Sequence, residues 1–218
     1  MTKLASICLD PGHGGSQPGA VNSRLNLKEK DIALAVSQRV AEYLLYASRD
    51  IVTGTFTINE FCPEEHKPLL NVFMTRGDDV DVTLQERCAF ANSISSACFV
   101  SIHCNSYSGT TANGIETWRW KEGSKKSKFL AESVHQYLME SVKEFVITDQ
   151  DGKFHAPKSR GVGKNQTYYT LRHTVMPSIV VEIGFISHDG EAKLMSTKEY
   201  QDAIARGIAL GILYATAV

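Results

Sequence analysis

This sequence of 218 residues contains two histidines and two glutamates whose types and sequence surroundings are those of a catalytic site. They are His13, Glu29, His103 and Glu182, and they lie far apart along the chain. A set of two His and one Glu binds catalytic zinc and leaves a fourth position for water. Zinc lowers the pKa of that water and polarises a carbonyl, and a further carboxylate can pass the proton to a leaving nitrogen. The chemistry that needs all four groups is hydrolysis of an amide.

Glu182 lies in the apolar run Ser-Ile-Val-Val-Glu-Ile-Gly-Phe-Ile, residues 178–186, directly after a proline. A short run of this kind predicts a buried strand that is covered on both faces. A glutamate is almost never fully buried without a partner. The partner could be an ordinary one, such as a backbone N–H or an arginine, or it could belong to a functional site. The surroundings of the other three residues bear on that choice.

His13 follows a short apolar stretch, residues 4–9, that predicts the first strand. It stands between glycines in the loop Asp-Pro-Gly-His-Gly-Gly-Ser-Gln-Pro-Gly-Ala, residues 10–20. The phosphate-binding patterns G-x-G-x-x-G and G-x-x-x-x-G-K-[ST] are both absent from this loop. A histidine in a loop is usually just exposed, so His13 on its own is weak evidence for a site.

His103 lies near the end of the apolar run Cys98–Asn105, which predicts another strand. Side chains alternate along a strand, so Cys104 faces away from His103 and is expected to pack in the core. Glu29 stands at the start of an amphipathic helix that the sequence predicts from Lys28 onward. An acidic residue in a first turn is favoured by the helix dipole, but that does not explain why Glu29 lies on the inward stripe.

Predicted strands alternate with predicted helices along most of the chain. Further strands are expected at residues 71–75 and 114–120, the second nearer an edge, and further helices at 83–92, 127–145 and from 196 onward. This order predicts an α/β fold with a largely parallel central sheet, in a single domain over residues 1–218. Ligands of open α/β sheets bind beyond the carboxyl ends of the strands. The four residues should therefore meet at one sheet edge.

Several details of these elements can be tested against a structure. Residues 83–86 form a capping box, and the helix that follows should turn Leu84, Cys88 and Ala91 inward. Ser196-Thr-Lys-Glu caps the last helix, which should bury Ile204, Ile208 and Ile212 and pack closely through Gly207 and Gly211. Residues 48–69 are expected to form a long connection, and residues 147–166 a polar loop that is mobile or faces substrate. We expect His66, His135, His155, His173 and His188 to be surface or structural residues, with His135 partly exposed.

The composition excludes several classes of protein. Hydrophobic residues make up 43% and charged residues 22% of the chain, as in a soluble globular protein. The net charge of −1 provides no long-range field toward nucleic acid or an anionic membrane, and no apolar run is long enough to span a bilayer. The amino-terminal apolar stretch is too short for a signal peptide, so we expect synthesis without an export signal, or an exported domain whose signal was removed. The five cysteines contain no C-x-x-C pair, which argues against a disulfide framework or a Cys₄ zinc site and favours core residues in a reducing compartment.

Five short blocks of the sequence resemble the zinc-dependent N-acetylmuramoyl-L-alanine amidases, and they occur in the same order. The blocks are Asp10-Pro-Gly-His13-Gly-Gly, Glu29-Lys-Asp31, Thr75-Arg76, Ser101-Ile-His103-Cys-Asn105 and Val181-Glu182-Ile-Gly-Phe-Ile-Ser187. The resemblance covers nearly the whole chain, and it implies a mixed, largely parallel central sheet flanked by helices on both faces. Three departures are visible: Gln17 stands where this family usually has Asp, His188 stands where it usually has Asn, and the segment before Thr75 is longer than usual.

The resemblance implies one Zn²⁺ per chain, held by His13, Glu29 and His103, with Glu182 as the catalytic carboxylate. It implies cleavage of the amide between the lactyl group of N-acetylmuramic acid and the L-alanine of the stem peptide. The partners are then the peptidoglycan stem peptide and glycan, without nucleic acid or membrane insertion, for a protein that we expect to be a monomer. Asn105 and Arg172 are candidates to contact substrate or to orient ligands.

Two other functions compete with the amidase. A non-catalytic wall-binding domain would keep the fold but needs an incomplete metal site, whereas all four residues are present. A zinc carboxypeptidase or endopeptidase that cuts within the stem peptide is the closer alternative. The biological role fits either a phage endolysin or the catalytic domain of an exported bacterial amidase.

Overall fold

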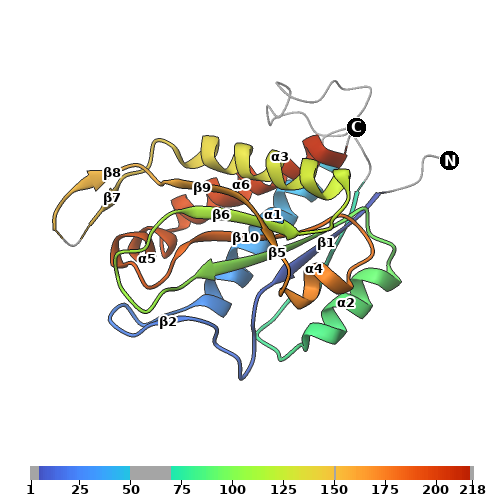
Figure 1. The fold of residues 1–218 in the computed structure, drawn as a ribbon, viewed down its shortest axis with the longest axis horizontal. Coiled ribbons are helices and arrows are strands. Elements are labelled where there is room, and N and C mark those ends of the chain that lie inside the picture. Colours follow the sequence, from blue (N-terminus) through green and yellow to red (C-terminus); the bar gives the residue numbers. More distant parts are fainter. Residues whose placement is uncertain (1–4, 50–69, 150, 217–218) are drawn as a thin grey trace.

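A six-stranded sheet forms the centre of the computed structural model, which describes residues 5–49, 70–149 and 151–216. The strand order is β4-β1-β5-β10-β6-β9 (Figure 1). Neighbouring strands run parallel except for the antiparallel pair β10 and β6. The predicted mixed, largely parallel sheet is therefore confirmed. The strands are β1 Ala5–Pro11, β4 Leu70–Met74, β5 Cys98–Asn105, β6 Ile115–Trp120, β9 Ser159–Asn165 and β10 Ser178–Phe185.

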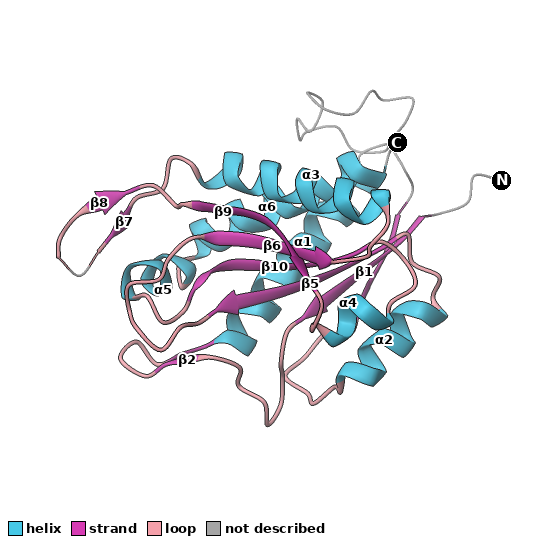
Figure 2. Ribbon diagram, in the orientation of Figure 1, coloured by secondary structure: helices cyan, strands magenta, loops and turns pink. Residues whose placement is uncertain are grey.

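Helices cover both faces of this sheet (Figure 2). The long helices α1 (Glu29–Arg49), α3 (Lys125–Val142) and α6 (Lys198–Thr216) form one layer, and the shorter α2 (Leu84–Ser93) and α4 (Tyr169–His173) lie on the other side. Side chains alternate along β10, so Ile179, Val181 and Ile183 join the large core under the long helices. Val180 and Glu182 therefore face the side of α2 and α4.

Close contact between α3 and α6 closes the large core. A Cβ atom on Gly207 would lie 2.6 Å from the Cα atom of Leu138, and one on Gly211 would overlap the backbone of Val134. The two helices therefore approach backbone to backbone, as predicted from the two glycines. The three isoleucines expected to face inward from α6 are fully buried: Ile204, Ile208 and Ile212.

The stretch 147–166 is not the loop that the sequence predicted. It contains a small hairpin, β7 (Ile147–Thr148) with β8 (Phe154–His155), and the edge strand β9. β9 lacks an apolar alternation because an edge strand is held mainly by its backbone hydrogen bonds, here in parallel to β6. Gly163 leaves the space that the ring of Trp118 fills, since a Cβ atom there would overlap the ring. Gly163 thus serves the packing of an edge strand.

Smaller predictions also changed. Leu84 is 50% exposed rather than inward, because the first turn of α2 lies at the molecular surface, whereas Cys88 and Ala91 are buried as expected. The capping box of α2 is confirmed. His135 is buried rather than partly exposed, since its ring lies between the hydroxyls of Thr117 and Ser159.

Element ends differ by a few residues from those expected. The helix predicted at 127–145 spans Lys125–Val142, and α6 starts at Lys198 with the Thr197 hydroxyl accepting from the N–H of Tyr200. A short helix, α5 (Asp189–Met195), was not predicted, and neither was the hairpin of β2 (Val21–Asn22) with β3 (Leu27–Lys28). Most of the connection expected at 48–69 lies outside the described residues.

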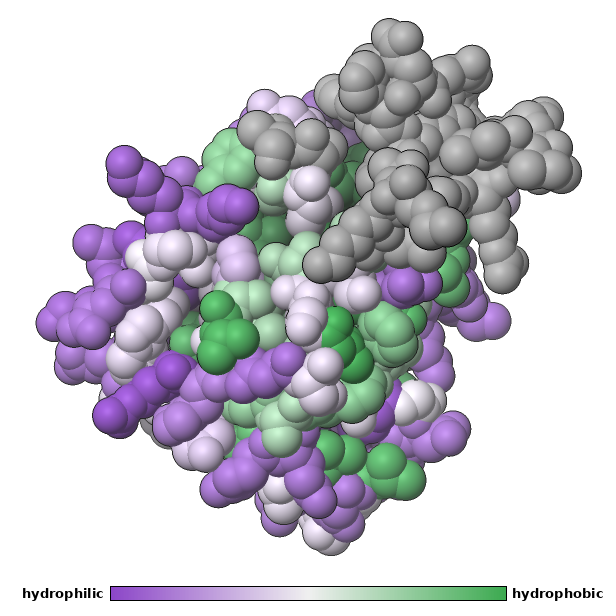
Figure 3. All heavy atoms as spheres, turned by 90° about the vertical axis from the view of Figure 1, so that its right-hand side faces the viewer, coloured by the Kyte–Doolittle hydropathy of each residue, from purple (hydrophilic) through white to green (hydrophobic). Residues whose placement is uncertain are grey.

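The described cysteines are packing residues. Cys8, Cys88, Cys98 and Cys104 are unpaired and buried, and burial raises the pKa of the Cys88 thiol to about 11. No helix within the described ranges combines the length and apolar character needed to cross a membrane. At the end of the molecule shown in Figure 3, hydrophobic residues lie mostly near the middle and hydrophilic residues around them.

Candidate active site

His13, Glu29 and His103 meet at the carboxyl edge of the sheet, as the sequence led us to expect. Glu29 Oε2 lies 3.1 Å from His13 Nε2, and Glu29 Oε1 lies 2.8 Å from His103 Nδ1. One ligand atom from each of the three residues lies within 4.8 Å of the other two. The two imidazole rings are nearly perpendicular, with centroids 5.1 Å apart. Two imidazoles thus converge on a single carboxylate.

Glu29 is anchored by backbone as well as by the histidines. The N–H of Ala20 donates to Oε2 at 2.8 Å, and the N–H of Cys104 donates to Oε1 at 3.0 Å. Burial raises the pKa of this carboxyl, but the hydrogen bonds and charges of His103 and His13 outweigh it, and the pKa falls well below the ordinary value. Glu29 is therefore ionised, and its inward position at the start of α1 is explained by these partners.

His103 takes up a proton readily in this arrangement. Burial lowers the pKa of its ring, but the hydrogen bond and the negative charge of Glu29 outweigh burial and raise the pKa to about 9. Without a metal, the imidazole is therefore a cation paired with a buried carboxylate at neutral pH. A divalent cation in the same place would replace that proton as the positive charge.

Two glycines make room for the three residues. A Cβ atom on Gly12 would overlap the ring of His103. A Cβ atom on Gly19 would lie 2.5 Å from Glu29 Oε2 and 2.6 Å from the ring of His13. His13 itself has a left-handed backbone with φ of 58°, a conformation that is uncommon outside glycine and must be held in place by its surroundings.

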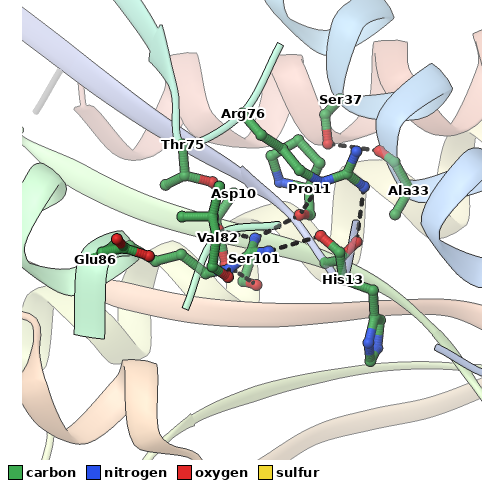
Figure 4. A network of polar contacts seen from close by, with 12 residues as sticks. Asp10, Pro11, His13, Ala33, Ser37, Thr75, Arg76, Val82, Glu86 and Ser101 are labelled. Atoms are coloured by element: carbon green, nitrogen blue, oxygen red, sulfur yellow. Dashed lines mark hydrogen bonds and ion pairs between the residues drawn. The ribbon is translucent and has the colours of Figure 1, made fainter. Parts of the chain in front are cut away.

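Two buried arginines hold the backbone around His13, and Figure 4 labels one of them, Arg76. Arg87, from α2, donates to the carbonyl oxygens of Pro11 and His13, at 2.6 Å in both cases. Arg76, from the turn after β4, donates to the carbonyl oxygens of Pro11 and Gly12. Carbonyls of the loop that carries His13 are thus satisfied by side chains from a distant part of the sequence.

Asp10 completes this network beneath the loop. Its carboxylate accepts hydrogen bonds from the hydroxyls of Thr75 and Ser101, both at 2.6 Å. It also forms a buried ion pair with Arg87, with 2.7 Å between Oδ1 and Nη1. Because every member is paired, the network can fix the end of β1 without leaving a buried charge unsatisfied.

Glu182 lies beside the three-residue cluster. It pairs in register with His103 across β10 and β5, and it is 7% exposed. Its Oε2 atom has no hydrogen-bond partner among the described residues, and its Oε1 atom is 3.5 Å from the hydroxyl of Tyr168. Burial raises the pKa of Glu182 to about 7, and the negative charge of Glu29 adds to that effect while His103 opposes it. A carboxyl with this pKa can both accept and donate a proton near neutral pH.

A cavity of about 490 Å³ opens beside these groups on the face of α2 and α4. It extends from the carboxyl edge of the sheet to the start of both short helices. Its lining includes Asp10, Gly12, His13, Gln17, Asp81, Leu84, Arg87, His103, Tyr168, Tyr169, Val180 and Glu182. Gln17, which departs from the family pattern, is therefore placed to influence substrate fit.

The other residues singled out from sequence lie further away. Asn105 donates to Glu116 Oε1, and Arg172 is exposed on α4; neither lines the cavity. Their predicted contact with substrate stays a prediction. His188 is 2% exposed and caps α5, accepting from the N–H of Glu191, so it has a structural place as expected.

Sequence reasoning did not single out Asp10, Arg87 or Tyr168. Arg87 had a visible signal, because it stands four residues before the buried Ala91 on the same helix. An arginine on an inward stripe needs a buried acid or carbonyl groups as partners. Tyr168 had no comparable signal, since it precedes a helix of five residues.

A layered α/β fold with two histidines and two glutamates at one sheet edge provides the donor types of a catalytic metal site. The family model described as N-acetylmuramoyl-L-alanine amidase matches residues 7–63 and 63–214. The chain belongs to this family.

Relatives and solved structures agree with this assignment. The chain is 32% identical to the uncharacterized protein YqiI of Bacillus subtilis over 95% of its own length and 82% of that protein. It is 27% identical to the germination-specific N-acetylmuramoyl-L-alanine amidase of the same organism, over 95% and 78% of the two chains. The crystal structure of an N-acetylmuramoyl-L-alanine amidase from Clostridium difficile 630 superimposes with a TM-score of 0.78 at 30% identity, covering 96% and 95% of the two chains.

Proposed function

We propose that this chain is a zinc-dependent amidase that hydrolyses the bond between N-acetylmuramic acid and the L-alanine of peptidoglycan. The observation that carries the proposal is the convergence of His13 and His103 on the buried Glu29, with Glu182 in register beside His103. Family membership supports the substrate class, and the geometry supports the choice of residues that would act on it.

The donor set fits a zinc ion. His13, Glu29 and His103 offer two nitrogens and one oxygen, the set known from catalytic zinc sites. Gly12 and Gly19 leave the room that a ligand cradle needs, since a side chain at either would strike a ligand. When bound, zinc supplies a Lewis acid that polarises the amide carbonyl and activates water.

Glu182 is the proton carrier in this proposal. Its unpartnered Oε2 atom can take a proton from the attacking water and give it to the nitrogen of the leaving L-alanine. Burial serves both steps, because a pKa of about 7 makes loss and gain of the proton nearly equal in free energy at neutral pH. Tyr168, whose hydroxyl lies near Oε1, limits the orientations open to the carboxyl.

Metal analysis and a peptidoglycan digest test the proposal together. We expect the purified protein to contain one zinc per chain and His13→Ala to lose it. The digest of purified peptidoglycan should release intact stem peptides that begin with L-alanine, identified by mass spectrometry. Fragments cut within the stem would instead indicate a carboxypeptidase or endopeptidase. A protein that holds no zinc, releases no fragments and still binds peptidoglycan would favour the wall-binding alternative.

The assembly and the origin of the protein belong to the same proposal. We propose that the protein is a monomer that binds the stem peptide and the glycan, and light scattering of the purified protein tests the monomeric state. Action on the cell wall follows from the family. Whether the chain serves as a phage endolysin or as an exported bacterial enzyme is decided by the codons that precede it in its gene.

A further inference from the structure

His103 and Glu182 belong to a row of paired residues that crosses the sheet and continues beyond Glu182. Glu182 pairs with His103 on one side and with Glu116 of β6 on the other, and Glu116 pairs with Gly161 of the edge strand β9. Paired residues on neighbouring strands face the same side of a sheet and are roughly 5 Å apart. Glu116 therefore lies next to Glu182 on the side away from His103, and β9 lies one strand further.

Glu116 holds the guanidinium of Arg160 at the end of this row. Arg160 Nε donates to Glu116 Oε2 at 2.8 Å, while Asn105 Nδ2 donates to Glu116 Oε1. Glu116 is 8% exposed, so both of its oxygens are used by these partners in a largely buried place. The guanidinium carbon also lies 5.1 Å from the ring centroid of the buried Phe185. The guanidinium plane of Arg160 is thus held at one edge by the carboxylate of Glu116 and at one face by the ring of Phe185.

The rest of the guanidinium is available to a ligand. The Arg160 side chain is 44% exposed. Only its Nε atom has a partner within the described part of the chain; Nη1 and Nη2 have none there. A planar guanidinium that is held at Nε presents its two terminal nitrogens as a fork, and such a fork matches a carboxylate with two parallel hydrogen bonds.

The order of His103, Glu182 and Glu116 across the sheet indicates which half of the substrate reaches Arg160. Under the proposed function, Glu182 gives its proton to the leaving amine, so the peptide product departs from the Glu182 side. The sugar-bearing carbonyl stays on the side of His13 and His103. Arg160 lies about two strand spacings, on the order of 10 Å, beyond Glu182. An extended peptide covers about 3.3 Å per residue, so a carboxylate two or three residues beyond the scissile amide comes within reach.

We propose that Arg160, oriented by Glu116 and Phe185, binds a carboxylate of the stem peptide and thereby selects stems that carry a free acid near the cleaved bond. This inference rests on the proposed amidase function and adds a specificity-determining residue to it. An amidated stem offers a neutral carboxamide in the same place. It lacks the second acceptor oxygen and the charge that the fork recognises.

Two synthetic muropeptides test this assignment. Both carry N-acetylmuramoyl-L-alanine joined to the amino group of D-glutamate, whose γ-carboxyl forms an amide with the next residue, and they differ only in a free α-carboxylate against an α-carboxamide. The variants are Arg160→Gln, Arg160→Lys and, as a matched control on the same strand, Lys164→Gln, whose side chain is exposed. The loss of charge-assisted hydrogen bonds should lower kcat/KM of Arg160→Gln for the acid about 10- to 100-fold, mainly through KM. The amide substrate should change by less than about twofold, and Arg160→Lys should restore only part of the preference, because it keeps the charge without the fork.

The outcomes separate this inference from the function on which it rests. If the wild-type protein cleaves neither muropeptide nor peptidoglycan, the amidase proposal fails and the inference fails with it. If the wild type is active but Arg160→Gln keeps the preference for the acid, or loses activity equally on both substrates, Arg160 does not bind the carboxylate. The thermal midpoint of the double variant Glu116→Gln/Arg160→Gln shows whether any loss comes from leaving Glu116 unpaired. A double variant that folds like the wild type and no longer distinguishes the two substrates supports the assignment.

Discussion

The Nη2 atom of Arg87 donates a hydrogen bond of 2.6 Å to the carbonyl oxygen of His13, although the two residues are 74 positions apart in the sequence. The imidazole of His13 contacts Glu29, while its backbone carbonyl is held by an arginine of α2. The left-handed conformation of His13 is therefore held by tertiary contacts, not by its own preference. A candidate metal ligand is positioned through its main chain.

Removal of Arg87 should loosen both the fold and the site. Arg87→Ala leaves Asp10 as a buried charge without its ion-pair partner and frees the carbonyls of Pro11 and His13. Breaking one partner of a buried pair costs on the order of 3–5 kcal/mol. We expect the free energy of unfolding in urea to fall by about that amount and the zinc content to fall with it. Arg206→Ala, on the exposed side of α6, is the control, and equal stability of the two variants would contradict the proposed role.

Glu182→Gln should separate metal binding from catalysis. Glutamine keeps the shape of the side chain but cannot carry the proton, so we expect full zinc content and a loss of hydrolysis on the order of 10²- to 10⁴-fold. Zinc analysis and release of stem peptides from peptidoglycan measure the two effects. Activity near that of the wild type would show that another group moves the proton.

Gly12→Ala should displace His103. The new methyl group would overlap the imidazole ring, and the ring can escape only by leaving Glu29. We expect weaker zinc binding and lower activity. Gly77→Ala is the matched control, because a Cβ atom there meets no atom within 4 Å. The free energy of unfolding of that control should stay within about 1 kcal/mol of the wild-type value. An equal loss of zinc in both variants would contradict the proposed role of Gly12 in leaving room for His103.

Zinc affinity should rise with pH up to about 9. The metal-free protein holds a proton on His103 below that pH, because Glu29 raises the pKa of the ring despite its burial. Zinc must displace this proton, so we expect the apparent dissociation constant to fall about tenfold per pH unit between about 7 and 9 and then to level off. Competition with a chelator of known affinity measures this, and a flat profile over that range would rule out a protonated His103.

The same proton affects the metal-free fold. The pKa of His103 is raised from 6.5 to about 9 on folding. Protonated His103 therefore stabilises the fold fully below about pH 6.5, and this contribution is lost as the pH rises through about 9. Zinc-loaded protein should not show this decline in the free energy of unfolding, because the metal takes the place of the proton. Urea unfolding of both forms between pH 6 and pH 10 provides the comparison.

Many of the helices and strands were predictable because their sequence signals are local. The apolar run of β10 and the helical spacing of apolar residues in α6 each predict which residues are buried, without reference to the rest of the chain. The edge strand β9 was missed because its stability comes from pairing with β6 and from the ring of Trp118 against Gly163, and neither partner is near it in sequence. His135 looked partly exposed for the same reason: its hydroxyl partners belong to β6 and β9.

The sequence by itself determined the chemical types of the site and their order, since His13, Glu29, His103 and Glu182 stand at the ends of elements that an α/β fold must bring to one edge. Only the tertiary structure decided which atoms face each other, how Arg87 and Arg76 hold the His13 backbone, and that Glu116 and Arg160 continue the row beyond Glu182. The reason is physical. Periodicity records which side of an element is buried, whereas register between strands and partners of buried charges depend on contacts between residues distant in sequence.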